Sequence, residues 1–157
     1  MNKNYYTKAK DINTIYRELK DNCVKRVIYI KKQKELWSYI HVTHNNCSNQ
    51  MKAINKKIGY YTHAINGLIS ELCKYNKTHK AMNIAYDYIV KEIKRAENII
   101  ARNEDTIYRT KLGLITLVCD DGKRTNDYYP LVTYVNQKKD MVSKLRKWLN
   151  HVSRYRV

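Results

Sequence analysis

The sequence has few of the residues that make turns, linkers and membrane spans. One proline and four glycines in 157 residues leave little material for flexible linkers or for a turn-rich all-β fold. No apolar run approaches the length of a membrane span, so a membrane protein is not expected. The N-terminal stretch MNKNYYTKAKD lacks the apolar segment of a signal peptide. These absences predict a single intracellular domain, residues 1–157, in the cytoplasm or in the nucleus of a eukaryotic host.

The sequence has only four cysteines and no phenylalanine. The four cysteines, Cys23, Cys47, Cys73 and Cys119, are widely spaced, and in an intracellular protein we expect them to be reduced thiols. The chain is instead rich in Lys, Asn, Ile and Tyr, with fifteen tyrosines. Such a bias suits the AT-rich genome of a virus, a phage or a mobile element.

Acidic residues are also scarce. Fourteen Asp and Glu stand against 31 Lys and Arg, which gives a formal net charge of +17. A folded chain with such an excess repels itself, and a polyanionic partner is the natural explanation. Solubility alone would not need one sign of charge in such excess. The charge therefore predicts a nucleic-acid partner, with a membrane surface or an acidic protein as alternatives.

Apolar residues recur at three- and four-residue steps over most of the chain, which predicts helices. The first predicted helix runs from Asp11, a suitable N-cap, to about His41. Its apolar ridge consists of Ile12, Ile15, Tyr16, Leu19, Cys23, Val27, Ile30 and Trp37. A further helix runs from about residue 80 to Arg102, and the following residues RNEDT are read as a break or a new start.

The last third of the chain changes character. Residues 114–135 contain β-branched runs around Asp121-Gly122, which predicts a hairpin with a two-residue turn. Residues 116–120 would pair with 123–127, and Pro130 would limit the return strand to an edge. A basic amphipathic helix is predicted over 138–155. The fold class is therefore mainly α, a helical domain of four to five helices with a small β-hairpin before the C-terminal helix.

The segment SNQMKAINKKIGYYTHAINGLISEL, residues 48–72, allows two interpretations. Gly59 accepts a positive φ without a steric clash, so it can form a tight turn between two helices, with Thr62 capping the second. With that turn, residues 50–72 resemble the generic helix-turn-helix of DNA-binding regulators. The alternative is one continuous helix from about Ser48 to Lys74, in which Gly59 is merely tolerated.

The resemblance implies that the second helix enters the major groove of DNA. Asn66 would bond to adenine and Thr62 would meet a thymine methyl or a phosphate. The nucleic-acid-binding residues that we expect are Lys52, Lys56, Lys57, Tyr61, Thr62, His63, Asn66 and Ser70. Lys144, Arg146 and Lys147 of the last helix add a second basic surface. The stretch from Leu36 to Ser70 contains no Asp or Glu, which suits a face laid against phosphates.

Other constellations predict neither metal binding nor catalysis. His41, His44 and Cys47 are zinc-type donors, but the paired Cys-x-x-Cys spacing of zinc sites is missing. Glu92, Glu97, Glu104 and Asp105 lie among Lys and Arg and are typical of solvated helix charges. No glycine-rich phosphate loop and no nucleophile with a neighbouring base is recognisable. We therefore expect a non-enzymatic protein without metal or cofactor.

The sequence thus predicts a nucleic-acid-binding protein, a duplex-DNA-binding regulator of transcription or replication from a virus, phage or mobile element. One alternative is a basic helical protein that binds an acidic protein partner. Another is an RNA or single-strand binder that stacks bases on tyrosine pairs; these pairs are Tyr5 with Tyr6, Tyr60 with Tyr61, and Tyr128 with Tyr129. Formation of a homodimer through the long helices would double such a surface, although no sequence feature requires it.

Overall fold

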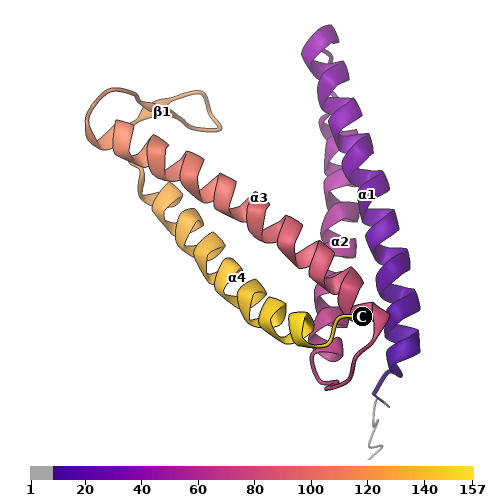
Figure 1. Cartoon of the computed structure of the whole chain (residues 1–157). Helices are drawn as coiled ribbons and strands as arrows, with labels where there is room; N and C mark the ends of the chain where they lie inside the picture. The colour runs from indigo at the N-terminus through magenta and orange to yellow at the C-terminus, as the bar shows by residue number, and fades with distance from the viewer. Residues whose placement is uncertain (1–8) are drawn as a thin grey trace, which may run out of the picture. The chain divides into compact units, whose positions relative to one another are not determined.

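The computed structural model describes residues 9–157 and confirms a mainly helical fold with a small hairpin before the last helix (Figure 1). Its elements are α1 (Ile12–Thr43), α2 (Ser48–Leu72), α3 (Lys80–Lys111), β1 (Leu117–Val118), β2 (Arg124–Thr125) and α4 (Tyr129–Arg154). Two compact units divide the chain: unit 1 is Met1–Tyr86 with His151–Val157, and unit 2 is Asp87–Asn150. Both α3 and α4 have residues in each unit. The expectation that residues 1–157 form a single domain therefore stays a prediction.

Helices α1 and α2 form an antiparallel helical hairpin in unit 1. The side chain of Asp11 accepts a hydrogen bond from the Asn13 backbone at 3.1 Å, which confirms Asp11 as the N-cap. At the other end α1 stops at His44, whose φ of 57° is left-handed and whose N–H donates to the Ile40 carbonyl. The residues between His44 and Ser48 then reverse the chain.

The core of unit 1 lies at one end of this helical hairpin. Its buried residues are Ile12, Ile15 and Leu19 of α1, Ile65, Leu68, Ile69 and Leu72 of α2, Ala81, Met82 and Ala85 of α3, and Val152 of α4. The first turns of α3 and the last turn of α4 supply the additional surfaces that two helices alone cannot provide. Most of the apolar burial in unit 1 therefore gathers where all four helices contribute.

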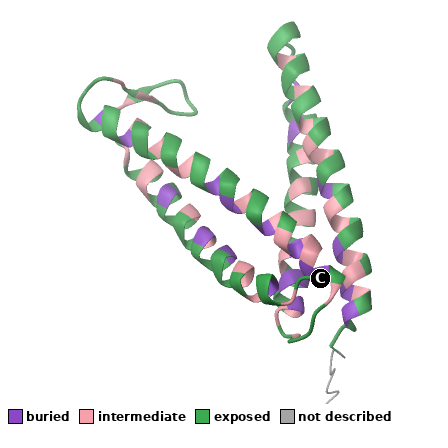
Figure 2. Ribbon diagram, in the orientation of Figure 1, coloured by how far each residue is buried: buried purple, intermediate pink, exposed green. Residues whose placement is uncertain are grey.

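The other end of the helical hairpin, residues 27–58, is called the distal arm below. No α1 residue between 27 and 43 is buried, and Figure 2 shows this end of α1 in the colours of exposed and half-buried residues. The predicted ridge is wrong here, because the side chains of Val27 and Trp37 are 64% and 57% exposed. Two helices cover only one strip of each other, so the remaining apolar side chains of the arm face solvent.

The turn predicted at Gly59 is wrong. Helix α2 is continuous from Ser48 to Leu72 and passes through Gly59 without a positive φ. A glycine inside a helix costs only about 1 kcal/mol relative to alanine, and the apolar face that α2 buries from Met51 to Leu72 outweighs that cost. The alternative interpretation, one continuous helix, is the one that the structure has.

We expect the substitution Gly59→Ala to stabilise the protein by about 0.5–1 kcal/mol, because a helical alanine loses less backbone entropy on folding. A Cβ added at position 59 meets nothing within 4 Å. Chemical denaturation monitored by helical circular dichroism measures the change. Gly122→Ala is the control, since Gly122 has a φ of +80° and its replacement should destabilise. A loss of stability in Gly59→Ala would contradict the continuous helix.

Helix α3 extends beyond Arg102, where the sequence predicted a break, to Lys111. The residues RNEDT are helical, and the true end is marked by Gly113 with a φ of +71°. The Gly113 N–H donates to the Thr110 carbonyl and the Leu114 N–H to the Arg109 carbonyl, each at 3.0 Å. This is the Schellman arrangement, in which a left-handed residue lets two late carbonyls be satisfied.

The hairpin is shorter than predicted and has a different turn. Leu117 pairs with Thr125 and Val118 with Arg124. The Cys119 N–H donates to the Lys123 carbonyl and the Gly122 N–H to the Cys119 carbonyl, so the loop has three residues rather than two. Gly122 takes the left-handed third position of such a loop, which explains why Asp-Gly still marks it.

Helix α4 begins at Tyr129 and not near Lys138. The side chain of Asp127 accepts from the Tyr129 N–H at 3.0 Å, and Pro130 lies in the first turn, where its missing N–H would have no helical partner. The sequence interpretation gave Pro130 to an edge strand and missed this second permitted place for proline.

In unit 2, α3 and α4 pack antiparallel. Lys139 pairs with Glu104 at 2.7 Å, and seven residues later on α4 Arg146 pairs with Glu97. Between the helices lie the buried residues Ile89, Ile93, Ala96, Ile107, Val135, Val142 and Leu145. Among the described residues, no helix combines the length and the apolarity required to cross a bilayer.

Burial raises the pKa of one cysteine thiol. Desolvation raises the pKa of the Cys73 thiol from 9.0 to about 11. Because the thiolate is the reactive form, we expect Cys73 to resist alkylation at neutral pH and to react faster as the pH approaches 11. Cys119 is exposed on the hairpin and serves as the control. Site-resolved mass spectrometry after brief alkylation measures both; equal rates at neutral pH would contradict the protection of Cys73.

Candidate nucleic-acid interface

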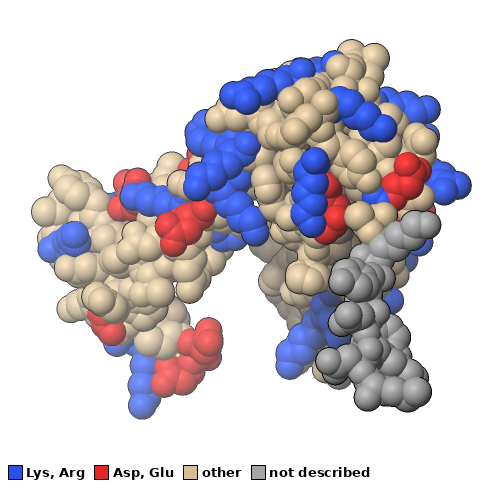
Figure 3. Space-filling view, turned by 90° about the horizontal axis from the view of Figure 1, so that it is seen from below, with Lys and Arg blue, Asp and Glu red and all other residues tan. Residues whose placement is uncertain are grey.

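Positive charge is concentrated in unit 1. By sequence this unit has eighteen Lys and Arg against five Asp and Glu, a formal +13, whereas unit 2 has thirteen against nine, a formal +4. On the face drawn in Figure 3, basic side chains are also more widespread than acidic ones. A polyanion would therefore be attracted first to unit 1.

Helix α2 presents one exposed face that is neutral to basic. Lys52, Lys56, His63 and Ser70 are exposed and recur at spacings of four and seven residues, which places them on one side of the helix. From Lys52 to Ser70 this face is about 27 Å long at 1.5 Å per residue. Within residues 9–157, no carboxylate forms an ion pair with Lys52, Lys56 or Lys57. Lys57 lies on the flank of this face, about 100° around the helix from Lys56, and we call these three the α2 lysines.

Three of the predicted base-reading residues do not lie on this exposed face of α2. Thr62 is half-buried: its hydroxyl accepts from Arg26 Nε at 2.8 Å and donates to the Ile58 carbonyl, so it is not an N-cap. Tyr61 is half-buried with its ring 5.7 Å from that of Tyr29 on α1. Asn66 is half-buried as well. The expectation that these three point outward fails because α1 covers the side of α2 from which Tyr61 and Thr62 project.

Helix α1 adds basic and aromatic side chains to the distal arm. Lys32 Nζ lies 4.8 Å from the centre of the Tyr29 ring, and Lys34 is exposed. The arm's one acid, Glu35, lies 4.0 Å from Lys31. The arm thus carries six Lys and one Glu, together with the buried Arg26 just before it.

Two of the three predicted basic residues on α4 contact other side chains. Arg146 pairs with Glu97 of α3, and Lys144 Nζ lies 4.9 Å from the Trp148 ring centre. Lys147 is exposed. These contacts lie in unit 2, whose net charge is small, so this surface attracts a polyanion less strongly than the arm does.

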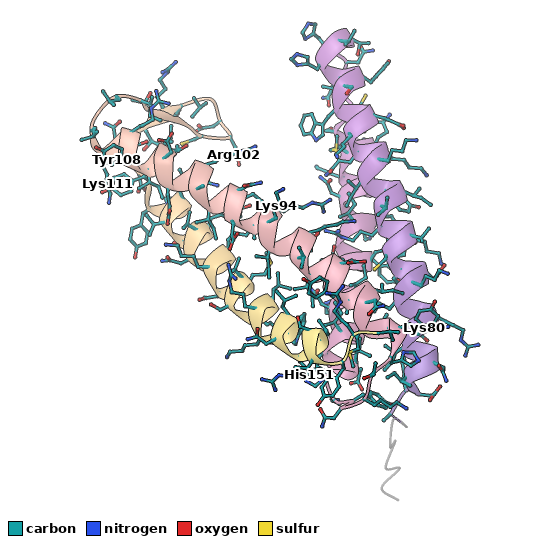
Figure 4. All side chains as sticks on the ribbon, in the orientation of Figure 1. Lys80, Lys94, Arg102, Tyr108, Lys111 and His151 are labelled. Atoms are coloured by element: carbon teal, nitrogen blue, oxygen red, sulfur yellow. The ribbon has the colours of Figure 1, made fainter. Side chains whose placement is uncertain are left out.

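A basic row on α3 was missed by the sequence interpretation. Lys91, Lys94, Arg102 and Arg109 are all exposed at helical spacing, and Figure 4 shows Lys94 and Arg102 extending from the same side of α3. The signal in the sequence was that these basic residues follow one another at spacings of three, eight and seven residues. It was lost because the helix was predicted to end at Arg102.

The tyrosine pairs differ in exposure. Tyr60 and Tyr129 are exposed, whereas Tyr61 and Tyr128 are half-buried. Lys111 Nζ lies 5.3 Å from the centre of the Tyr128 ring. Tyr5 and Tyr6 lie outside the described residues. A pair of adjacent stacking rings is therefore not presented by either described pair.

Several residues considered for metal binding or catalysis take part in a helix cap, in the buried interior or in ion pairs. His44 caps α1, and Cys47 is buried before α2. Glu92 pairs with Arg95 at 2.9 Å, while Glu97 and Glu104 pair with α4. Within residues 9–157, no three His, Cys, Asp or Glu side chains gather closely enough to hold a metal ion.

Comparisons with protein-family models, with curated proteins and with solved structures find no match for this chain. Its function is therefore inferred from the charges, the exposed faces and the recesses of the chain itself.

Proposed function

We propose that the protein is a non-enzymatic nucleic-acid-binding protein whose distal arm lies against the phosphate backbone of duplex DNA, with the exposed face of α2 in contact. Regulation of transcription or replication in a virus, phage or mobile element is the setting that fits such a protein. The predicted turn plays no part in this proposal, because α2 is continuous.

One observation carries the proposal: Lys52 and Lys56 lie on an exposed face of α2 that has no carboxylate, and Lys57 is exposed on the flank of that face. Each lysine that meets a phosphate releases a condensed counterion, so binding becomes strongly dependent on salt. Phosphate contacts of this kind position a protein on the duplex without reading its sequence. His63 and Ser70, exposed on the same face, are the residues best placed to add contacts to base edges or sugars.

A titration with duplex DNA, single-stranded DNA and RNA at about 50 mM and about 200 mM salt tests this proposal. The expected result is binding that favours the duplex and weakens by one or more orders of magnitude at the higher salt. Fluorescence anisotropy of labelled oligonucleotides measures it. Absence of binding to all three at the lower salt would overturn the proposal.

A second candidate function is docking of an acidic protein partner, and an exposed strip on α1 favours it. Val24, Val27 and Ile28 are exposed side by side, with Lys20 and Lys31 one turn before and after them. An amphipathic helix with acidic edges would cover such a strip and pair with the lysines. This candidate gains support if the titration shows no nucleic-acid binding.

A further inference from the structure

The connection between α1 and α2 forms a recess at the end of the distal arm. Its volume is about 340 Å³, and its lining comes from the end of α1, the connection and the start of α2. The lining residues are Trp37, Ile40, Asn45, Asn46, Cys47, Ser48, Met51, Lys52 and Asn55. The buried side chains of Cys47 and Met51 give it an apolar floor. A volume of this size is in the range of small-molecule pockets.

A flat aromatic ring and three amides line the recess. The indole of Trp37 is more than half exposed at its wall. Each amide is held at one end: Asn45 Nδ2 donates to the Tyr39 hydroxyl, Asn46 Oδ1 accepts from the Ser48 N–H, and Asn55 Oδ1 accepts from Gln33 Nε2. The opposite ends, two amide N–H₂ groups and one carbonyl oxygen, form no hydrogen bond with the described residues and could bond a ligand in the recess.

These groups match the chemistry of a nucleobase. A base is a flat ring that stacks on an aromatic side chain, and its edge carries acceptors and donors that amides bond. Lys52 lies at the rim, and Lys56 follows one helical turn later along α2. A phosphate attached to the base would thus find positive charge beside the recess, and the lining of the recess contains no Asp or Glu to repel it.

We propose that this recess binds one unpaired base of the nucleic acid that α2 holds. The inference rests on the proposed function and narrows its substrate to DNA with a single-stranded end or gap beside a duplex. A paired base would not fit, because its edge and faces are covered within the stack and it must first leave it. The duplex then lies along α2, and the unpaired nucleotide reaches the connection before α2.

Fluorescence of Trp37 tests the inference in a Trp148→Phe background, where Trp37 is the remaining tryptophan. Three DNAs are compared: a blunt duplex, the same duplex with a single-stranded overhang, and that overhang with abasic sites in place of bases. The expected result is quenching of Trp37 by the overhang DNA only. The overhang should also bind about ten-fold more tightly than the blunt duplex, as stacking of one base implies.

Two variants check the wall of the recess. Trp37→Ala and Asn55→Leu should each reduce the overhang preference while leaving blunt-duplex affinity unchanged; both side chains are exposed, so folding should persist. Equal affinity for all three DNAs without quenching would overturn the recess as a base site and leave the proposed function standing. No binding to any of the three DNAs would overturn both the base site and the proposed function. Quenching by an acidic peptide and by no DNA would assign the recess to a protein partner and likewise overturn the inference.

Discussion

Replacing the α2 lysines together, as Lys52→Gln, Lys56→Gln and Lys57→Gln, is expected to weaken duplex binding on the order of a hundred-fold near 0.1 M salt. Each lysine that meets a phosphate contributes about 0.9 to the slope of log affinity against log salt, so the slope should fall by about 3. All three side chains are exposed, so the fold should remain intact. Anisotropy titrations over a range of salt measure both quantities.

A matched triple variant separates the effect of lysine position on affinity from the effect of net charge. Lys91→Gln, Lys94→Gln and Lys123→Gln remove the same charge from exposed sites in unit 2. We expect this variant to keep most of the affinity and nearly all of the salt slope, because long-range attraction falls off within about 10 Å at 0.1 M salt. If both triple variants lose affinity and slope equally, the lysines act through net charge and the α2 face is not the contact surface.

Leu19→Ala should lower the free energy of unfolding by about 2–5 kcal/mol. Leu19 is 0% exposed in the core of unit 1, and truncation leaves a cavity that its neighbours fill incompletely. Such a loss is a large part of the total stability of a domain this size. Urea denaturation measures it, with loss of helical circular dichroism as the signal.

Val27→Ala on the same helix is the control for Leu19→Ala. Because Val27 is exposed in the distal arm, we expect a change within about 0.5 kcal/mol. A large loss at Val27 would mean that another surface covers the arm in solution, through a partner helix or a second copy. A small loss at Leu19 would contradict the placement of the core at the end shared by four helices.

Much of the fold was predictable from local signals that have single physical causes. Asp11 caps α1 because a carboxylate satisfies an open N–H of the first turn, and that signal needs no tertiary context. Gly122 marks the hairpin because its left-handed φ is open mainly to glycine. The loop length was missed, since Asp-Gly fits both a two-residue turn and the end of a three-residue one.

Gly59 and Pro130 show where local signals are ambiguous. A glycine permits a turn without requiring one, and whether the helix continues depends on the apolar surface that it buries against α1. Pro130 excludes a central strand but is equally suited to the first turn of a helix. Arg102 illustrates a related failure, because the residues after it have modest helix propensity and are held helical by packing with α4, where Ile107 is buried and Glu104 pairs with Lys139.

The candidate site was only partly visible in the sequence. The α2 lysines were found from the stretch without acids, and their exposure needs only helical geometry. The burial of Thr62 against Arg26 could not be predicted, since it depends on how α1 and α2 cross. The recess was missed for a similar reason: Trp37 and Asn55 are eighteen residues apart and meet only when the chain reverses at His44.

The most direct test of the arm as the DNA contact is lysine acetylation mapped by mass spectrometry with and without duplex DNA. We predict that DNA protects Lys52, Lys56 and Lys57 from acetylation, while Lys91, Lys94 and Lys123 react as they do in the free protein. Protection that is equal at all six lysines, or confined to the three in unit 2, would contradict the claim that the distal arm and its α2 face meet the phosphates.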